Sequence, residues 1–393
     1  MNLDKYLNDG SKKFNIKEFK TKDKGEFASR EEAVGEFIQN LNEINRLQQK
    51  LYSERKEGVI FVFQAMDAAG KDGVIRTVFS TLSPHGVKEY CFKAPSQEEL
   101  THDYLWRFWP ALPPKGGISI FNRSYYEDVL IGRVHKLYEN QKYADRVDKK
   151  KIIQKRYEQI NNFEKYLYDN SIRVVKIFLN VSKDEQAKRF ISRIDTPEKH
   201  WKISEGDIKE REYWDEYQKA FEVVINKTST KESPWYIVPA DKKWYARLIV
   251  SRIVLQTLKD MDPRFAEISP DEYDRVLDYR ATLVDSLPKK DKEDFEKPDD
   301  SVFFNSKNIV TDAIIKEEAK KSAAKAEEVA LSQIEDDGIE ESGHETDESN
   351  RFAQTQDVKI VISNETPINN NVTDKVKPEI GLNKNVDGTT LLQ

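Results

Sequence analysis

The sequence predicts an α/β fold in which helices flank a central parallel sheet. Short runs of β-branched and aromatic residues alternate with stretches of helical periodicity through about the first 260 residues. Several of the short runs are apolar throughout instead of alternating with polar residues, which is typical of parallel strands that are covered on both faces. Together these observations indicate a layered α/β domain.

The first predicted helix covers residues 31–57, where apolar side chains recur every three to four positions, from Val34 to Leu51. Strands are predicted at 59–63, 88–92, 118–121, 174–181 and 235–238. Helices are predicted between them at 72–82, 95–110, 125–138, 149–169, 183–193 and 207–227. A closing helix near 243–258 ends before Pro263, and a weaker helix follows at 270–283.

The chain is predicted to form one folded domain with an extension at each end. Residues 1–29 are expected to form an N-terminal extension, 30–262 the folded domain, and 263–287 a helical appendix. The C-terminal region contains no Trp or Tyr after Tyr279, and 335–348 holds eight acidic residues and no Lys or Arg. Because such a segment cannot bury enough apolar surface, most of 288–393 is predicted to be disordered.

Composition excludes several classes of protein. Of the 393 residues 38% are hydrophobic, and no run approaches the ~18 apolar residues that span a bilayer. The N-terminus lacks the apolar core of a signal peptide, so a cytoplasmic location without a membrane partner is expected. The net charge of -6 gives no overall basic character, and nucleic acid is not expected as a partner.

The single cysteine, Cys91, excludes an intramolecular disulfide and cysteine-rich zinc sites. Because it falls in a predicted strand, it is expected to be a small buried side chain. No GxSxG or HExxH motif occurs, so hydrolase triads and zinc proteases have no support in the sequence.

The strongest local signal is FVFQAMDAAGKDG at 61–73, where an apolar strand stops at a loop of small residues and a helix begins. This strand, loop and helix context is what a phosphate-binding loop requires. Backbone N–H groups would surround an anion, and Lys71 would add a mobile positive charge. The residues expected to form this cradle are Ala68, Ala69, Gly70, Asp72 and Gly73.

The segment departs from the GxxxxGK[ST] pattern at two positions. Ala65 stands in place of the first glycine, and Asp72 in place of the Ser or Thr that binds Mg²⁺ through its hydroxyl. Asp67, inside the loop, is the expected replacement, because a carboxylate is a hard oxygen donor suited to Mg²⁺. The alternative is that Gly70 and Lys71 mark only an ordinary turn before a helix.

A second signal, ISIFNRSYYEDVL at 118–130, is also an apolar strand that ends in polar groups. At the carboxyl end of a parallel strand such groups point into the crevice where ligands bind. Asn122 and Arg123 follow the strand, and Arg123 can hold phosphoryl oxygens with two hydrogen bonds. Glu127 and Asp128 fall on the first turn of the next helix, where a simple capping role is the alternative.

A third signal lies at 188–217, where Arg189 and Arg193 occupy one predicted helix and Thr196-Pro197 interrupts it. A mobile hairpin that carries arginines could close over bound phosphates and exclude water. A solvated charged face is the alternative interpretation. The aromatic residues of this stretch are expected to pack in the interior rather than to stack on a base: Trp201, Trp214 and Tyr217.

Four ordered segments together resemble the type-2 polyphosphate kinase family over about residues 10–260: AMDAAGKDG, FNRSYYEDVL, RIDTPEKHWKISEGD and TSTKESPWYIVPADKKWYARL. The resemblance implies a three-layer α/β/α fold of the P-loop kinase type, related to thymidylate kinase, with a helical lid at about 188–217. It implies phosphoryl transfer between inorganic polyphosphate and AMP, ADP or ATP, with guanine nucleotides left open. Mg²⁺ would be the cofactor, with Mn²⁺ as an alternative, and homo-oligomers are expected.

The resemblance also implies roles for individual residues. Asp67 and Lys71 match the phosphate-loop residues, Arg123 matches the arginine after the second strand, and Arg189 and Arg193 match the lid arginines. One departure matters. Family members that mainly use diphosphates resemble FDRSWYN at the second motif, whereas this chain has Asn122 and continues YYED, which is similar to the AMP-accepting branches. Without a carboxylate at 122, metal coordination is expected to shift to Asp67 and to Glu127 or Asp128.

Two other functions stay open on the sequence alone. One is an ATP-dependent nucleoside monophosphate kinase on the same fold, which would be expected to carry Ser or Thr at the position of Asp72. The other is a non-catalytic protein that only binds polyanions. A screen of ATP against polyphosphate as donor, with product analysis, separates all three hypotheses.

Overall fold

The structure is a computed structural model that describes residues 3–292 and residue 295. A six-stranded sheet forms its centre, in the strand order β1-β6-β5-β2-β4-β3. All neighbouring pairs are parallel except β1 and β6. The strands are β1 (Leu7–Asn8), β2 (Gly58–Ala65), β3 (Val87–Cys91), β4 (Ile118–Asn122), β5 (Ile172–Asn180) and β6 (Trp235–Pro239). The predicted parallel α/β fold is confirmed.

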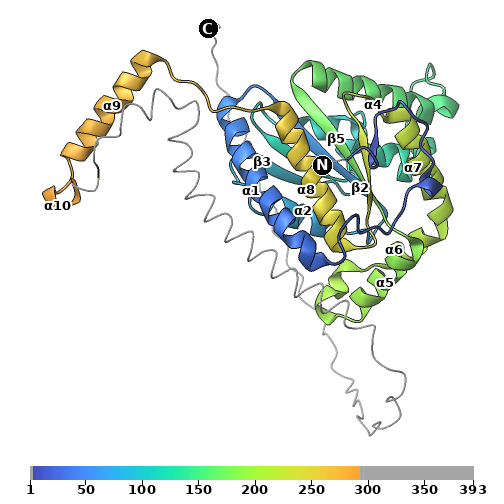
Figure 1. The fold of residues 1–393 in the computed structure, drawn as a ribbon. Coiled ribbons are helices and arrows are strands. Elements are labelled where there is room, and N and C mark those ends of the chain that lie inside the picture. The colour runs from blue at the N-terminus through green and yellow to red at the C-terminus, as the bar shows by residue number, and fades with distance from the viewer. Residues whose placement is uncertain (1–2, 293–294, 296–393) are drawn as a thin grey trace, which may run out of the picture. The chain divides into compact units, whose positions relative to one another are not determined.

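Helices lie on both faces of this sheet (Figure 1). On one face α1 (Arg30–Glu54) and α2 (Lys71–Val78) pack against α8 (Lys243–Met261). On the other face α4 (Ile152–Asp169) packs against α7 (Trp214–Thr228). The remaining helices are α3 (Ile131–Val134), α5 (Lys183–Ile194), α6 (Glu205–Glu210), α9 (Pro270–Asp285) and α10 (Lys289–Lys292).

The central strands are buried because helices cover both of their faces. Every residue of β4 and all but the last of β2 are buried, which explains their continuous apolar sequences. Register pairs Phe63 of β2 with Asn122 of β4 and with Ile177 of β5. The carboxyl ends of the three strands therefore meet at one edge of the sheet, where the order of the strands along the chain reverses.

Two of the predicted helices are instead broken into short turns. Residues 95–110 contain only the 3₁₀ turns Glu99–Thr101 and Trp106–Ala111, the second of which includes Pro110. Residues 125–138 form a 3₁₀ turn, η4 (Tyr125–Val129), and then α3, because Leu130 leaves the helical region at φ -101° and ψ -92°. Local propensity alone does not reveal either break.

The N-terminal segment of residues 3–28, here called the N-terminal arm, contributes to the core. Leu3, Tyr6 and Phe14 are buried, and β1 of the arm adds an antiparallel edge strand to β6. The arm also reaches the loop after β6, where the N–H of Asp241 donates to the carbonyl of Thr21 at 2.9 Å. The sequence alone predicts only an N-terminal extension here.

Two predictions of burial are wrong. Cys91 is exposed, because it ends β3, the edge strand that pairs only with β4. Trp201 is 79% exposed, whereas Trp214 and Tyr217 pack in the core as predicted. Trp201 lies in a 3₁₀ turn without any buried residue, so no neighbouring element covers its ring.

No helix in residues 3–292 is long and apolar enough to cross a membrane. The disorder predicted for 288–393 falls almost wholly outside the described residues, which include only 288–292 and 295 of that range.

Candidate functional site

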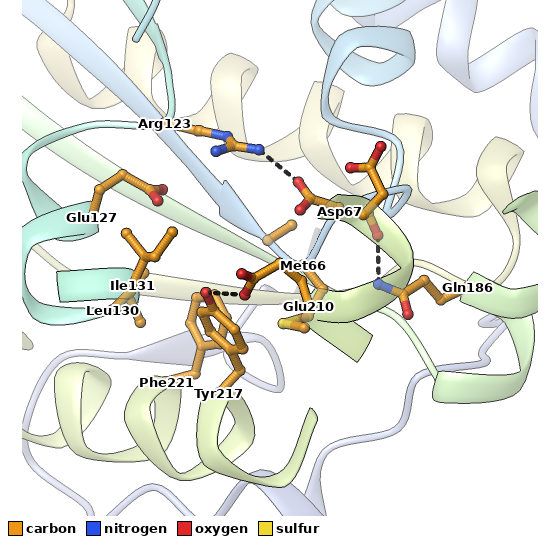
Figure 2. Close-up of a pocket in the computed structure, with 12 residues that line it drawn as sticks. Met66, Asp67, Arg123, Glu127, Leu130, Ile131, Gln186, Glu210, Tyr217 and Phe221 are labelled. Atoms are coloured by element: carbon orange, nitrogen blue, oxygen red, sulfur yellow. Dashed lines mark hydrogen bonds and ion pairs between the residues drawn. The ribbon is translucent and has the colours of Figure 1, made fainter. Parts of the chain in front are cut away.

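A pocket lies beside the carboxyl ends of β2 and β4 (Figure 2). It encloses about 500 Å³ of empty space, part of which is open to solvent. Its walls combine acidic and apolar side chains with a single arginine. The lining residues are Ala65, Met66, Asp67, Arg123, Glu127, Leu130, Ile131, Gln186, Asp207, Glu210, Tyr217 and Phe221.

The first wall is the loop between β2 and α2, residues 66–70, here called the phosphate loop. Ala68 at φ +60° and Gly70 at φ +101° both adopt the left-handed conformation, which turns the chain sharply into α2. Gly70 stands at the N-cap of α2 and no side chain caps this end. The first N–H groups of the helix are thus available to an anion, as the sequence predicts.

Lys71 lies beneath the phosphate loop. Its side chain is 8% exposed, and its Nζ donates to the carbonyls of Ala65 at 3.1 Å and Met66 at 3.4 Å. Burial and the nearby Arg123 guanidinium lower the pKa of Lys71, against the opposing effect of Asp67. Lys71 is not among the residues that line the pocket, but its ammonium is held by the carbonyls of two residues that do, Ala65 and Met66.

Arg123 and Asp67 form the polar centre of the pocket. The Nη2 of Arg123 donates to Asp67 Oδ1 at 2.6 Å (Figure 2). Arg123 itself has φ +65°, and its N–H donates to the carbonyl of Phe63 at 3.0 Å. Burial would lower the pKa of Arg123, but Glu127 and Asp67 raise it above its usual value, so the guanidinium stays charged.

Glu127 faces the same centre from η4. Burial raises the pKa of its carboxyl group, and the charges of Arg123 and Lys71 partly oppose this shift. With its amide oriented to satisfy both atoms, Gln64 donates to Glu127 Oε1 at 2.8 Å. Glu127 therefore adds a carboxyl group to the polar centre, within reach of the positive charges of Arg123 and Lys71.

The structure does not bring Asp128 to the pocket. Its carboxylate pairs with Arg156 of α4 at 2.7 Å. Burial raises the pKa of Asp128, opposed by Arg156. Consecutive residues of a tight turn point in different directions, so Glu127 faces the pocket whereas Asp128 faces Arg156. The predicted metal role of Asp128 therefore has no geometric support.

Asn122 is buried between two acidic residues. Its amide donates to Asp72 Oδ1 at 2.9 Å and to Glu89 Oε1 at 3.4 Å. An amide satisfies both carboxylates, whereas an aspartate at 122 would place a third negative charge beside them. Asn122 thus holds Asp72, at the start of α2, against the end of β4.

Arg189 is attached to the phosphate loop, not exposed on a lid. The guanidinium has five N–H donors, and each of them faces an acceptor. The partners are the carboxylate of Glu185 and the carbonyls of Ala68, Ala69, Ala240 and Asp241. In this structure the guanidinium therefore fixes the loop from behind, and the predicted role of Arg189 as a lid arginine stays a prediction.

Arg193, one turn further along α5, is available to a ligand. Its guanidinium lies over the ring of Phe190 at 5.5 Å and has no ion pair among the described residues. Burial lowers the pKa of Arg193, while the carboxylates of Asp207, Asp72 and Asp67 oppose this shift. The guanidinium is therefore directed toward the acidic side of the site.

Residues 195–213, here called the lid, supply pocket residues that the sequence analysis missed. Asp207 and Glu210 of α6 line the pocket, and Glu210 accepts a hydrogen bond from Tyr217 at 2.7 Å (Figure 2). His135 contacts the same carboxylate at 3.0 Å. No motif marks these positions, because acidic residues at a helix start also occur as ordinary capping groups.

Gln186 of α5 connects the lid to the phosphate loop. Arg211 of the lid donates to Gln186 Oε1 at 2.6 Å, and Gln186 Nε2 donates to the carbonyl of Asp67 at 2.8 Å. The spacing of Arg189 and Gln186 on one helix could have indicated a shared inward face, since they are three positions apart.

The carboxylates of the pocket fit a magnesium site in which substrate phosphates supply part of the coordination. No group of three His, Cys, Asp or Glu residues suited to a metal ion occurs in the described chain. Mg²⁺ usually keeps several waters and takes only one or two protein carboxylates together with phosphate oxygens. Asp67 and Glu127 are carboxylates of this type, because both line the pocket and both act on the charge of Arg123.

Comparison with known proteins gives one consistent result. The model of a family described as polyphosphate kinase 2 matches residues 27–266. The chain is 43% identical to an ADP-polyphosphate phosphotransferase of Rhodopseudomonas palustris, over 70% of this chain and 98% of that protein. It is 42% identical to an AMP/ADP-polyphosphate phosphotransferase of Meiothermus ruber, over 67% of this chain and 96% of that protein.

A solved structure agrees with these relatives. The crystal structure of polyphosphate kinase 2 from Arthrobacter aurescens TC1 is similar with a TM-score of 0.63 and 39% identity. The similarity covers 70% of this chain and 93% of that chain.

Proposed function

The chain belongs to the polyphosphate kinase 2 family, and we propose that it transfers phosphoryl groups between inorganic polyphosphate and AMP or ADP at the pocket beside the phosphate loop. The observation that carries this proposal is the convergence of three elements. The phosphate loop with Lys71, the Arg123–Asp67 pair and the lid all meet at the same end of the sheet.

This arrangement supports phosphoryl transfer by positioning and charge neutralisation. Lys71 and the uncapped start of α2 bind phosphate oxygens, while Arg123 holds the oxygens of the transferred group. A nucleotide phosphate is already ionised near neutral pH, so the acceptor needs no general base. The chain therefore has to align donor and acceptor in line and exclude water, and the lid supplies that closure.

Magnesium would be held by Asp67 and Glu127, and Asp128 is not part of this proposal. When bound, such an ion would neutralise negative charge on the phosphoanhydride. Asp67 also holds the Arg123 guanidinium at 2.6 Å, so the same carboxylate aligns the two positive groups. Mn²⁺ is the alternative ion, since it accepts the same oxygen donors.

The proposed acceptors include both AMP and ADP. The two relatives compared over most of their length are named for ADP and for AMP/ADP. In this chain Asn122 keeps the region between Asp72 and Glu89 free of a further negative charge. Guanine nucleotides as additional acceptors and assembly into homo-oligomers remain predictions, which a nucleotide screen and light scattering would test.

The decisive experiment is product analysis with the full chain. We expect ADP or ATP to form from AMP or ADP when Mg²⁺ and polyphosphate are present. Lys71→Met should reduce this turnover about a thousandfold, because it removes a charge that stabilises the transferred group. Lys165→Met is the matched control, because Lys165 is an exposed lysine on α4 whose ion pair, within residues 3–292, is with the nearby Asp169.

The alternatives give different results in the same assay. An ATP-dependent monophosphate kinase would form ADP from AMP with ATP and not with polyphosphate. A polyanion-binding protein would retain polyphosphate in a salt-dependent manner and form no nucleotide product. Equal turnover of Lys71→Met and Lys165→Met would contradict the proposed site.

A further inference from the structure

A buried polar network lies behind the wall of the pocket. Lys176 of β5 is completely buried, and its Nζ donates to Glu164 Oε2 of α4 and to the carbonyl of Thr228, both at 2.6 Å. Thr228 also accepts from the indole N–H of Trp235 at 2.9 Å. The network thus joins two strands to the two helices that cover this face of the sheet.

Two consecutive tyrosines connect this network to the site. The hydroxyl of Tyr125 donates to Glu164 Oε1 at 2.8 Å, and the hydroxyl of Tyr126 donates to the same oxygen at 2.7 Å. Burial and the Glu164 carboxylate raise the pKa of both tyrosines well above the usual value, so both hydroxyls stay protonated donors. One carboxylate oxygen therefore fixes both rings.

The tyrosines follow Arg123 directly in the chain. Arg123 has φ +65°, a conformation that a non-glycine residue keeps only where its surroundings over-determine it. Ser124 accepts a hydrogen bond from the N–H of Tyr126 at 3.2 Å, and its carbonyl accepts one from the N–H of Glu127 at 3.0 Å. Any shift of the two rings would therefore displace both Arg123 and Glu127.

Stability alone does not account for this network. Replacing a buried ion pair by well-packed apolar side chains is often neutral or stabilising, because both charges lose their hydration. An ion pair that accepts hydrogen bonds from two hydroxyl groups also fixes the orientation of the two tyrosine side chains, since hydrogen bonds restrict angles that apolar packing leaves free. We propose that Lys176 and Glu164, acting through Tyr125 and Tyr126, are positioning residues that hold Arg123 and Glu127 in the geometry of phosphoryl transfer.

The proposal rests on the proposed function, and the test uses variants that remove only a hydroxyl group. Tyr126→Phe should lower kcat about tenfold, and Tyr125→Phe combined with Tyr126→Phe about a hundredfold, because small misplacements of reacting groups cost that much. The KM for the nucleotide should change less than about twofold. Tyr6→Phe is the matched control, since it removes a buried hydroxyl that bonds Tyr245 at 2.6 Å outside this network.

A thermodynamic cycle separates positioning from a general loss of structure. In an Arg123→Lys background the tyrosine double variant should cost less than about twofold in kcat, because the group that it positions is already altered. The proposal would be overturned if the tyrosine double variant lowered kcat by the same factor in both backgrounds, or if Tyr6→Phe lowered kcat as much as Tyr126→Phe does. Absence of turnover in the unmodified chain would instead contradict the proposed function.

Cys91 gives a readout that does not depend on turnover. It is the single cysteine, it is exposed, and it pairs in register with Asn122, the residue before Arg123. Because the segment after Asn122 lies beside this exposed thiol, a shift of that segment should change the accessibility of the thiol and alter the rate of modification by a thiol reagent about twofold. The rate in the tyrosine double variant should move from that of the unmodified chain toward that of Arg123→Ala, and an unchanged rate would contradict the proposal.

Discussion

The phosphate loop and the lid border the same pocket, but they are held in place in different ways. Four consecutive carbonyls of the loop, from Met66 to Ala69, accept hydrogen bonds from Lys71, Gln186 or Arg189. No residue from 195 to 213 in the lid is buried, and its polar links to the rest of the site depend on Glu210 and Arg211.

The difference follows from what each element has to do. A phosphate cradle needs N–H groups fixed in advance, because ordering them upon binding would reduce affinity. A cover over the reaction has to open and close, so it is built from contacts that cost little to break. The following predictions test this contrast, beginning with the largest expected effect.

Arg189→Lys should affect the phosphate loop most strongly. A lysine has three donors and no planar fork, so several of the carbonyls at 68 and 69 of the phosphate loop and at 240 and 241 after β6 would lose their partners. We expect kcat to fall about a hundredfold and the free energy of unfolding to fall by about 3 kcal/mol. Steady-state kinetics and thermal unfolding measure the two effects.

Arg193→Lys on the same helix is the matched comparison for stability. Its guanidinium has no ion pair in the described chain, so Tm should change by less than about 2 °C. An equal loss of Tm in both variants would show that Arg189 has no special part in fixing the loop.

Arg211→Ala should weaken the lid without destabilising the fold. It removes the hydrogen bond to Gln186 at 2.6 Å, which is the link between the lid and the phosphate loop. We expect the KM for the nucleotide to rise about tenfold with little change in kcat, because a looser lid weakens ground-state binding. A lower Tm with unchanged KM would instead assign Arg211 to the structural core.

Glu127→Gln should make the fold more stable at neutral pH. Burial raises the pKa of Glu127 in the folded state, so the folded chain favours the protonated form and loses stability as pH rises through that pKa. The neutral glutamine avoids this loss, and Tm should rise by about 2 °C at pH 8. At pH 4, below the ordinary pKa of a glutamate, the two proteins should unfold at the same temperature.

The same variant should also weaken the response to magnesium, since one of the two proposed carboxylate donors is lost. Titration of turnover with Mg²⁺ should require about tenfold more of the ion. A variant with raised Tm and an unchanged magnesium dependence would remove Glu127 from the proposed donor set and leave Asp67 alone.

Trp201→Ala should have the smallest effect on stability. The ring is 79% exposed and sits on the lid, so removing it leaves no cavity in the core. Tm should change by less than about 1 °C, which differential scanning fluorimetry resolves. A loss of several degrees would mean that the lid is packed more firmly than its exposure indicates.

Much of the fold could be predicted because periodicity and burial agree along the chain. The continuous apolar runs of β2, β4 and β5 predicted parallel strands, and α1 and α8 begin within one residue of their predicted starts. The breaks at Pro110 and Leu130, and the pairing of the N-terminal arm with β6, could not be predicted in this way. They depend on which segment lies alongside another after folding.

The candidate site was only partly predictable for the same reason. The phosphate loop and Arg123 follow strands directly, so a local motif locates them. The contrasting roles of Arg189 and Arg193 and the separation of Glu127 from Asp128 depend on side-chain direction, which neighbouring elements decide.

By itself the sequence determined the parallel sheet, the position of the phosphate loop and the family resemblance, because each rests on residues close together in the chain. Only the tertiary structure decided which charged groups share the pocket and which are used to fix it. The reason is that hydrogen bonds and desolvation act over a few ångströms in space, and residues such as Lys176, Gln186 and Arg189 find their partners on elements far away in sequence.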